Sequence, residues 1–119
     1  MFGRPVAALV FLTAGATLAQ APSAPVATVH YDCAGGKSLS AEYFDGPTRT
    51  APDGRPIPGG RVVLTLADGK KLTLPQTLSG SGVRYANDGE TFVFWSKGDT
   101  AFVEEGQTAT YKDCVGRRT

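Results

Sequence analysis

The sequence has few of the residues from which enzyme and metal sites are built. Its 119 residues include one His and two Cys. It contains no H-E-x-x-H pair, no phosphate-binding loop and no cluster of metal ligands. His30 falls on the polar face of an alternating segment, where a surface position is the ordinary interpretation. We therefore expect no enzyme activity, no metal and no cofactor.

An excess of charge of one sign is also missing. The formal net charge is +1. Arg4 is the only charged residue among the first 19, so the rest of the chain carries eleven basic and eleven acidic residues. Without a basic stripe we expect no nucleic-acid partner, and a protein partner must be recognised by local fit rather than by long-range attraction.

Long apolar runs are confined to the N-terminal end. Residues 1–19 contain Arg4, then the run from Val6 to Leu12, and end on small residues at Ala19. This order is typical of a secretory signal peptide, and the run is shorter than the roughly 20 residues of a membrane span. The alternative is an uncleaved anchor. We expect cleavage after Ala19.

Cleavage after Ala21 also fits the small-residue rule but would leave Pro22 at the new terminus. No Cys follows the apolar run, so we expect no lipid attachment and no stable membrane anchor. The product would be periplasmic or secreted. Residues 20–27 predict a flexible linker rich in Pro, Ala and Ser, and residues 28–116 a single domain.

Cys33 and Cys114 are the only cysteines. In an exported protein such a lone pair predicts one disulfide, here joining the first strand to the last. Two reactive thiols are the competing interpretation, but there is no C-x-x-C motif.

The mature chain shows alternating apolar and polar residues and no helical periodicity, which predicts an all-β protein. The alternating segments are 29–33, 39–43, 62–66, 72–74, 83–86, 91–96, 101–104 and 108–113. Eight short antiparallel strands close most naturally into a small barrel, because closure removes exposed sheet edges. At this size we expect side chains to fill the interior, leaving no room for a ligand.

Facing apolar residues suggest how the strands pair. A three-residue loop at 34–36 sets Tyr31 opposite Leu39. Around Asp68-Gly69 we expect Leu66 opposite Leu72. Pro75 should end its strand or place it at a sheet edge, because proline has no backbone N–H to donate to a neighbouring strand.

The segment 45–60 is dense in Gly and Pro and predicts a long loop without strands. Such a loop is either functional or a tolerated insertion, and we favour the insertion.

A hairpin signal lies at Asn87-Asp88-Gly89, between two apolar runs. Counting outward from Gly89 sets Ser81 opposite Lys97 at the open end of the hairpin. Phe94 should pack in the core, whereas Trp95 faces the other side of the sheet and could be core or a contact anchor.

Several segments together resemble a known family. They are Cys33 with Gly36, the run SGSGVRY, the run FWSKG, and Tyr111 with Cys114. They are similar to the MliC/PliC family, the bacterial membrane-bound and periplasmic inhibitors of C-type lysozyme. The resemblance spans Tyr31 to Cys114. Departures are the absent lipid-attachment Cys, Ser96 where the family often has Thr, and a longer segment 45–60.

The resemblance implies an eight-stranded barrel, a Cys33–Cys114 disulfide, and two loops that enter the lysozyme cleft. Lys97 would pair with one catalytic carboxyl group and Ser81 would hydrogen-bond the other. The implied contact residues are Ser81, Gly82, Tyr85, Ser96, Lys97 and Gly98. Gly82 and Gly98 would allow tight loops, and Tyr85 would brace the first loop. The alternative function is an exported structural or envelope-associated binding module that does not inhibit lysozyme.

Overall fold

The structure is a computed structural model that describes Gly3 and residues 24–119. Apart from Gly3, the predicted signal peptide lies outside the described residues, as does the first half of the predicted linker. Residues 24–26 precede the first strand, which begins at Ala27, the last residue of the predicted linker.

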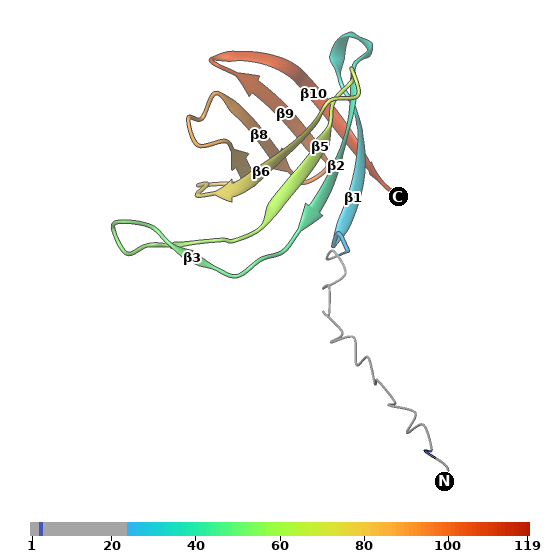
Figure 1. The fold of residues 1–119 in the computed structure, drawn as a ribbon. Coiled ribbons are helices and arrows are strands. Elements are labelled where there is room, and N and C mark those ends of the chain that lie inside the picture. Colours follow the sequence, from blue (N-terminus) through green and yellow to red (C-terminus); the bar gives the residue numbers. More distant parts are fainter. Residues whose placement is uncertain (1–2, 4–23) are drawn as a thin grey trace.

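Eight strands close into an antiparallel barrel, as predicted (Figure 1). Around the barrel the order is β1-β10-β9-β8-β7-β6-β5-β2. The strands are β1 (Ala27–Asp32), β2 (Ser38–Phe44), β5 (Arg61–Thr65), β6 (Lys71–Thr77), β7 (Val83–Ala86), β8 (Phe92–Lys97), β9 (Thr100–Glu105) and β10 (Thr108–Arg118). Each barrel strand pairs with a neighbour on both sides, although β6 pairs with β7 only at Gln76 and Thr77.

Alternation along each strand fills the centre of the barrel. In β5, Val62 and Leu64 are fully buried while their neighbours in sequence are partly exposed. Phe94 of β8 is also fully buried and meets Tyr31 edge to face at 5.9 Å between ring centroids. The centre is therefore packed with side chains, as the sequence suggests.

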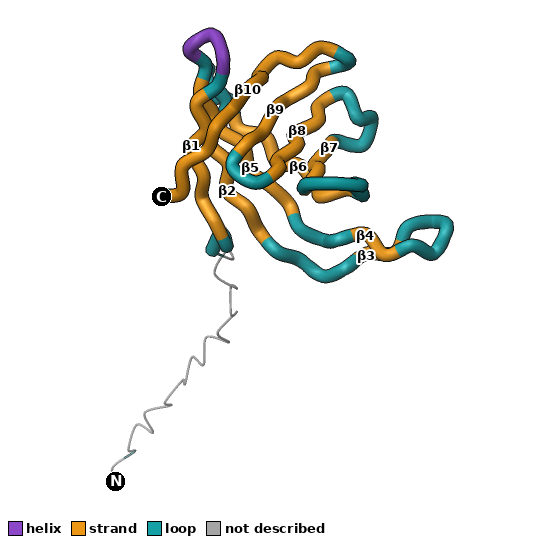
Figure 2. The backbone as a smooth tube through the Cα atoms, turned by 180° about the vertical axis from the view of Figure 1, so that it is seen from behind, coloured by secondary structure: helices purple, strands orange, loops and turns teal. Residues whose placement is uncertain are grey.

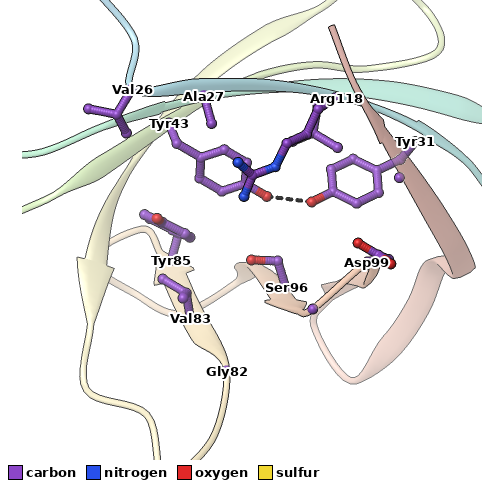
Figure 3. Close-up of a pocket in the computed structure, with 13 residues that line it drawn as sticks. Val26, Ala27, Tyr31, Tyr43, Gly82, Val83, Tyr85, Ser96, Asp99 and Arg118 are labelled. Carbon is purple, nitrogen blue, oxygen red and sulfur yellow. Dashed lines mark hydrogen bonds between the residues drawn. The ribbon is translucent and has the colours of Figure 1, made fainter.

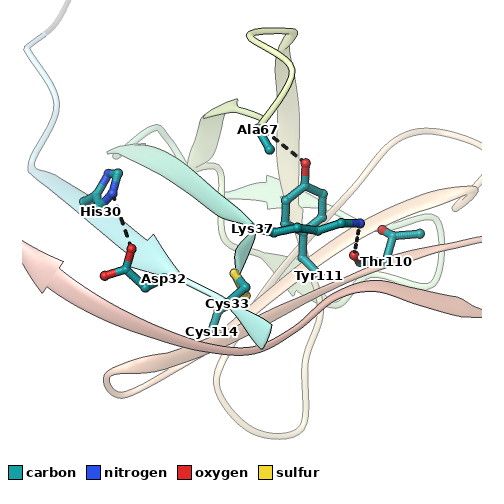
Figure 4. The surroundings of a disulfide bond; sticks show 8 residues. All are labelled: His30, Asp32, Cys33, Lys37, Ala67, Thr110, Tyr111 and Cys114. Carbon is teal, nitrogen blue, oxygen red and sulfur yellow. Dashed lines mark hydrogen bonds and ion pairs between the residues drawn. A yellow bond between two sulfur atoms is a disulfide. The ribbon is translucent and has the colours of Figure 1, made fainter. Parts of the chain in front are cut away.

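The disulfide joins Cys33 to Cys114 and lies toward one end of the barrel (Figure 4). Cys33 directly follows β1 and precedes a single 3-10 turn, η1 (Ala34–Gly36). In β10, Tyr111 and Cys114 are both buried although three residues apart, because the ladder bulges between them and Asp113 takes a φ of +54°. The bulge turns Cys114 inward, where it can meet Cys33.

One predicted register is wrong by two residues. The first hairpin pairs Tyr31 with Leu39 as expected. In the next, Leu64 rather than Leu66 lies opposite Leu72, because the Leu66 N–H donates to the Lys70 carbonyl oxygen and closes a tight three-residue loop. A shift of two residues keeps every side chain on its face, so the apolar pattern alone cannot detect it.

The strand containing Pro75 is also longer than predicted. β6 continues through Pro75 to Thr77. Arg61 of β5 pairs with Pro75, and from Gln76 onward β6 pairs with β7. Pro75 therefore lies where the strand gains its second neighbour, rather than at its end.

The segment 45–60 contains a short ladder that the sequence did not predict. β3 (Arg49–Thr50) pairs with β4 (Pro56–Ile57) in a separate two-stranded sheet, and the arm points away from the barrel (Figure 2). Arg49 donates to the carbonyl oxygen of Gln76 at 2.8 Å, tying the arm to β6. A proline is compatible with so short an edge ladder, so the loop is an ordered arm.

Among Gly3 and residues 24–119, no helix is long and apolar enough to cross a membrane.

Candidate functional site

Two connections meet at one end of the barrel, which we call the mouth. The segment 78–82 joins β6 to β7, and the turn Gly98-Asp99 joins β8 to β9. Because β7 and β8 are neighbours, both connections emerge side by side. The start of β1 and the end of β10 border the same opening (Figure 3).

The predicted pairing of Ser81 with Lys97 is wrong by one residue. The ladder pairs Val83 with Ser96 and Tyr85 with Phe94. A Cβ built on Gly82 would lie 3.2 Å from the Cβ of Lys97, so Gly82 is the neighbour of Lys97. Ser81 is one residue farther along the chain.

The register follows from packing and from the turn. Tyr85 and Phe94 are both buried, and the observed register sets them opposite each other on one face, whereas a shift of one residue would place them on opposite faces. The Glu90 N–H donates to the Asn87 carbonyl oxygen, and Glu90 has a φ of +54°, so the turn is not centred on Gly89. Ser81 and Lys97 nevertheless remain exposed at the same end.

The backbone of the Ser81 loop is held in place by side chains. The carbonyl oxygen of Ser81 accepts a hydrogen bond from the indole N–H of Trp95 at 2.7 Å. It also accepts from the hydroxyl of Ser79, whose oxygen lies 3.3 Å from the Ser81 amide nitrogen. The hydroxyl of Ser81 makes no hydrogen bond within the described residues, so a fixed backbone presents an available hydroxyl group.

Gly82 adopts a conformation that disfavours any other residue. Its φ is +67°, and an added Cβ would lie 2.6 Å from the Ser96 carbonyl oxygen. Glycine is therefore required both by the backbone angle and by the close approach of β8.

Lys97 ends β8 immediately before a two-residue turn. Lys97 pairs with Thr100, Gly98 has a φ of +58°, and the Thr100 hydroxyl donates to the Lys97 carbonyl oxygen at 2.9 Å. Glycine at the first central position is the pattern of a type II′ hairpin turn. The Lys97 ammonium forms no ion pair with a described carboxylate, so it remains available to a partner.

Tyr85 and Ser96 face the barrel interior. Tyr85 is 4% exposed and Ser96 is 8% exposed. Tyr85 packs against Tyr43 and Phe94 at ring-centroid distances of 5.9 and 6.2 Å. Their side chains therefore support β7 and β8 from inside, and the surface of the mouth is formed by Ser81, Gly82, Lys97 and Gly98.

The sequence motifs do not point to the support on the outer face of the sheet. There the Arg84 guanidinium donates to Thr77 Oγ1 and to Glu90 Oε1, each at 2.9 Å, and lies 5.7 Å from the centroid of the Trp95 ring. Trp95 stacks on Phe102 at 5.8 Å. Alternation places Arg84 and Trp95 on one face, which was the available signal for this cluster.

Two buried tyrosines, Tyr31 and Tyr85, and the partly buried Tyr43 surround the inner part of the mouth. Tyr31 and Tyr43 share a hydrogen bond of 2.6 Å between their hydroxyl oxygens. Burial, as the largest cause, raises the pKa of Tyr31, Tyr43 and Tyr85 above the ordinary tyrosine value. All three side chains are therefore neutral at physiological pH.

Together these features define a small disulfide-linked barrel that presents a hydroxyl group and an ammonium group on two rigid connections at one end. Among the described residues, no group of three or more His, Cys, Asp or Glu could hold a metal ion, and His30 lies on β1.

Comparisons with known proteins identify the family. Residues 57–111 match the family model described as membrane-bound lysozyme-inhibitor of c-type lysozyme (MliC). A Yersinia enterocolitica protein named membrane-bound lysozyme inhibitor of C-type lysozyme is 36% identical over 107 residues, covering 90% of this chain and 75% of the relative. A Cupriavidus necator protein of the same name is 36% identical over 74 residues, covering 62% of this chain and 49% of the relative. No solved structure matches.

The chain therefore belongs to the MliC family, as the sequence motifs predict.

Proposed function

We propose that this protein inhibits C-type lysozyme by placing the Ser81 and Lys97 connections in the active-site cleft. The observation that carries the proposal is the exposure of both side chains at one end of the barrel, on backbones fixed by Trp95 and by the Gly98 turn. Relatives that carry the inhibitor name supply independent support.

The chemistry of the target matches what the mouth offers. Lysozyme uses two carboxyl groups, one protonated as the general acid and one ionised. The Lys97 ammonium pairs with the ionised carboxylate, and the Ser81 hydroxyl hydrogen-bonds the other carboxyl group. Hydrogen bonds to a charged group contribute about 1.5–3 kcal/mol each.

The spacing of the two connections also suits this target. Neighbouring strands in a sheet lie about 4.8 Å apart. The two carboxyl groups of a retaining glycosidase lie about 5 Å apart. Because Gly82 is adjacent to Lys97 across neighbouring strands and Ser81 is the next residue, one barrel end presents both side chains to the same partner.

The proposed inhibitor is not an enzyme, and it is neither cleaved nor modified when it occupies the cleft. Export is directed by residues 1–19, and the inhibitory domain is formed by residues 28–116. The linker before this domain is residues 20–27. The exported protein protects peptidoglycan from muramidases in the periplasm or outside the cell.

A lysis assay tests the function. Purified mature protein is titrated into a C-type lysozyme acting on peptidoglycan, and inhibition is expected at micromolar concentration or below. Absence of inhibition at micromolar concentration overturns the function and leaves the binding-module alternative.

A further inference from the structure

A cavity of about 440 Å³ opens at the mouth, between the two proposed inhibitory connections and the first and last barrel strands (Figure 3). Side chains fill the centre of the barrel, as predicted, and the cavity lies at its end. The cavity arises at the end because Gly82, Gly98 and Gly116 contribute no side chains to its wall. Its volume falls within the range of small-molecule sites, about 300–1,000 Å³.

The cavity wall is mainly aromatic and aliphatic. Tyr31, Tyr43 and Tyr85 line it together with Val29 and Val83. No residue of the arm 45–60 is among the described residues that line the cavity. An apolar wall with a few placed polar groups is the usual composition of a ligand site.

The hydroxyl groups on this wall include a hydrogen-bond donor without an acceptor among them. Tyr31 and Tyr43 share one hydrogen bond between their hydroxyl oxygens, and Ser96 also lines the cavity. The two tyrosine hydroxyl groups carry two protons but make one hydrogen bond between them. The second proton has no acceptor in this pair and can be donated to a ligand.

Charges of both signs surround this wall: burial and Tyr43 raise the pKa of Tyr85 most, the Asp45 carboxylate raises it further, and Arg118 is positive. The Arg118 guanidinium lies over the cavity beside Tyr43 (Figure 3). It forms no ion pair with a described carboxylate, whereas Arg117 lies 3.4 Å from Asp32. Arg118 lowers the pKa of Tyr31 and Tyr43 in opposition to burial, so its charge acts inside the cavity. Asp99 borders the cavity on another side and disfavours an anion there.

We propose that the mouth cavity binds a small amphiphilic carboxylate, with its apolar chain against the tyrosine and valine wall and its carboxylate at Arg118 and the spare hydroxyl donor.

The bound carboxylate would lie directly behind the inhibitory connections. Gly82 and Gly98 line the cavity and also flank Lys97. A lysozyme seated on Lys97 would cover the cavity opening, so ligand and lysozyme would compete. This competition rests on the proposed function, whereas binding of the carboxylate does not.

Direct titration of the purified protein with octanoate tests the binding. We expect saturable binding by calorimetry. In NMR spectra we expect the largest amide chemical-shift changes at Gly82, Gly98 and Gly116. Arg118→Ala should weaken binding roughly tenfold or more, the loss expected for one charged hydrogen bond. Arg117→Ala is the matched control and should bind as the wild type does, while Asp99→Asn should bind more tightly.

Octanol and octylammonium are control ligands that distinguish a carboxylate site from a nonspecific apolar surface. Both should bind more weakly than octanoate. Unsaturable octanoate binding overturns the proposal. So does an Arg118→Ala variant with native melting behaviour and unchanged affinity, or equal affinity for octanol.

The lysozyme assay is then repeated with octanoate, with lysozyme alone in octanoate as the control. Weaker inhibition in the presence of octanoate supports competition, and unchanged inhibition overturns it. If the ligand-free protein fails to inhibit, the proposed function fails, but the calorimetric result for the cavity still stands.

Discussion

The indole N–H of Trp95 donates to the carbonyl oxygen of Ser81 at 2.7 Å, joining a residue inside β8 to the tip of the neighbouring connection. Trp95 is itself stacked on Phe102. The loop that presents Ser81 is thereby fixed before any partner arrives, which lowers the cost of ordering it on binding.

Trp95→Phe should weaken lysozyme inhibition between about two- and tenfold, because it removes one hydrogen bond, worth about 0.5–1.5 kcal/mol, and keeps a ring against Phe102. Inhibition constants and thermal melting measure the two effects. Phe102→Leu is the control: it removes the stacking and should lower stability without an equal loss of inhibition. Unchanged inhibition by Trp95→Phe would contradict the preorganised loop.

Gly82→Ala should lower both stability and inhibition. The added Cβ meets the Ser96 carbonyl oxygen at 2.6 Å at a φ of +67°, and such strain costs on the order of 1–3 kcal/mol. Gly80→Ala is a matched control two residues earlier, where an added Cβ meets nothing within 4 Å. Urea unfolding and inhibition assays compare the pair, and equal behaviour of the two variants would refute the assigned constraint.

Removing the disulfide should cost about 4–5 kcal/mol, because Cys33 and Cys114 are separated by 81 residues and their bond restricts the unfolded chain. The double variant Cys33→Ala/Cys114→Ala is compared with the wild type by urea unfolding. Reducing agent should destabilise the wild type and leave the double variant unaffected. A loss below about 1 kcal/mol would show that the barrel does not depend on this bond.

Stability should be constant from neutral pH to about pH 9 and should fall above about pH 10. Burial raises the pKa of Tyr31, Tyr43 and Tyr85 in the folded state, so above the ordinary tyrosine pKa the unfolded chain loses protons that the folded chain retains. Fewer protons on the unfolded chain mean that the free energy of unfolding decreases with pH.

Denaturant unfolding across this pH range measures the decline. Tyr85→Phe removes one titrating group and should make the decline shallower. An identical slope in the variant would show that Tyr85 is not among the groups responsible.

Much of the fold could be predicted from local patterns. Alternation identified the barrel strands, and the lone cysteine pair identified the disulfide that joins Cys33 to Cys114. The registers of two hairpins could not be predicted, because they depend on hydrogen bonds inside the turns, such as that from the Leu66 N–H to the Lys70 carbonyl oxygen.

The site was predictable only in part. The motifs placed Ser81 and Lys97 at one end, but the one-residue shift that makes Gly82 the neighbour of Lys97 follows from burial of Tyr85 and Phe94 together. The ladder in the arm and the cavity at the mouth were missed because both depend on contacts between distant parts of the chain. Gly116, for example, borders the mouth only because β10 pairs with β1.

The most direct test of the account compares inhibition of a C-type lysozyme by Lys97→Ala, by Ser81→Ala and by Lys70→Ala, whose exposed lysine lies in the β5–β6 turn at the other end of the barrel. All three variants should melt as the wild type does, because none of these side chains is buried. Lys97→Ala should weaken inhibition roughly 10- to 100-fold, the equivalent of one charged hydrogen bond, and Ser81→Ala by a smaller factor, while Lys70→Ala should inhibit as the wild type does. Full inhibition by Lys97→Ala would contradict the account.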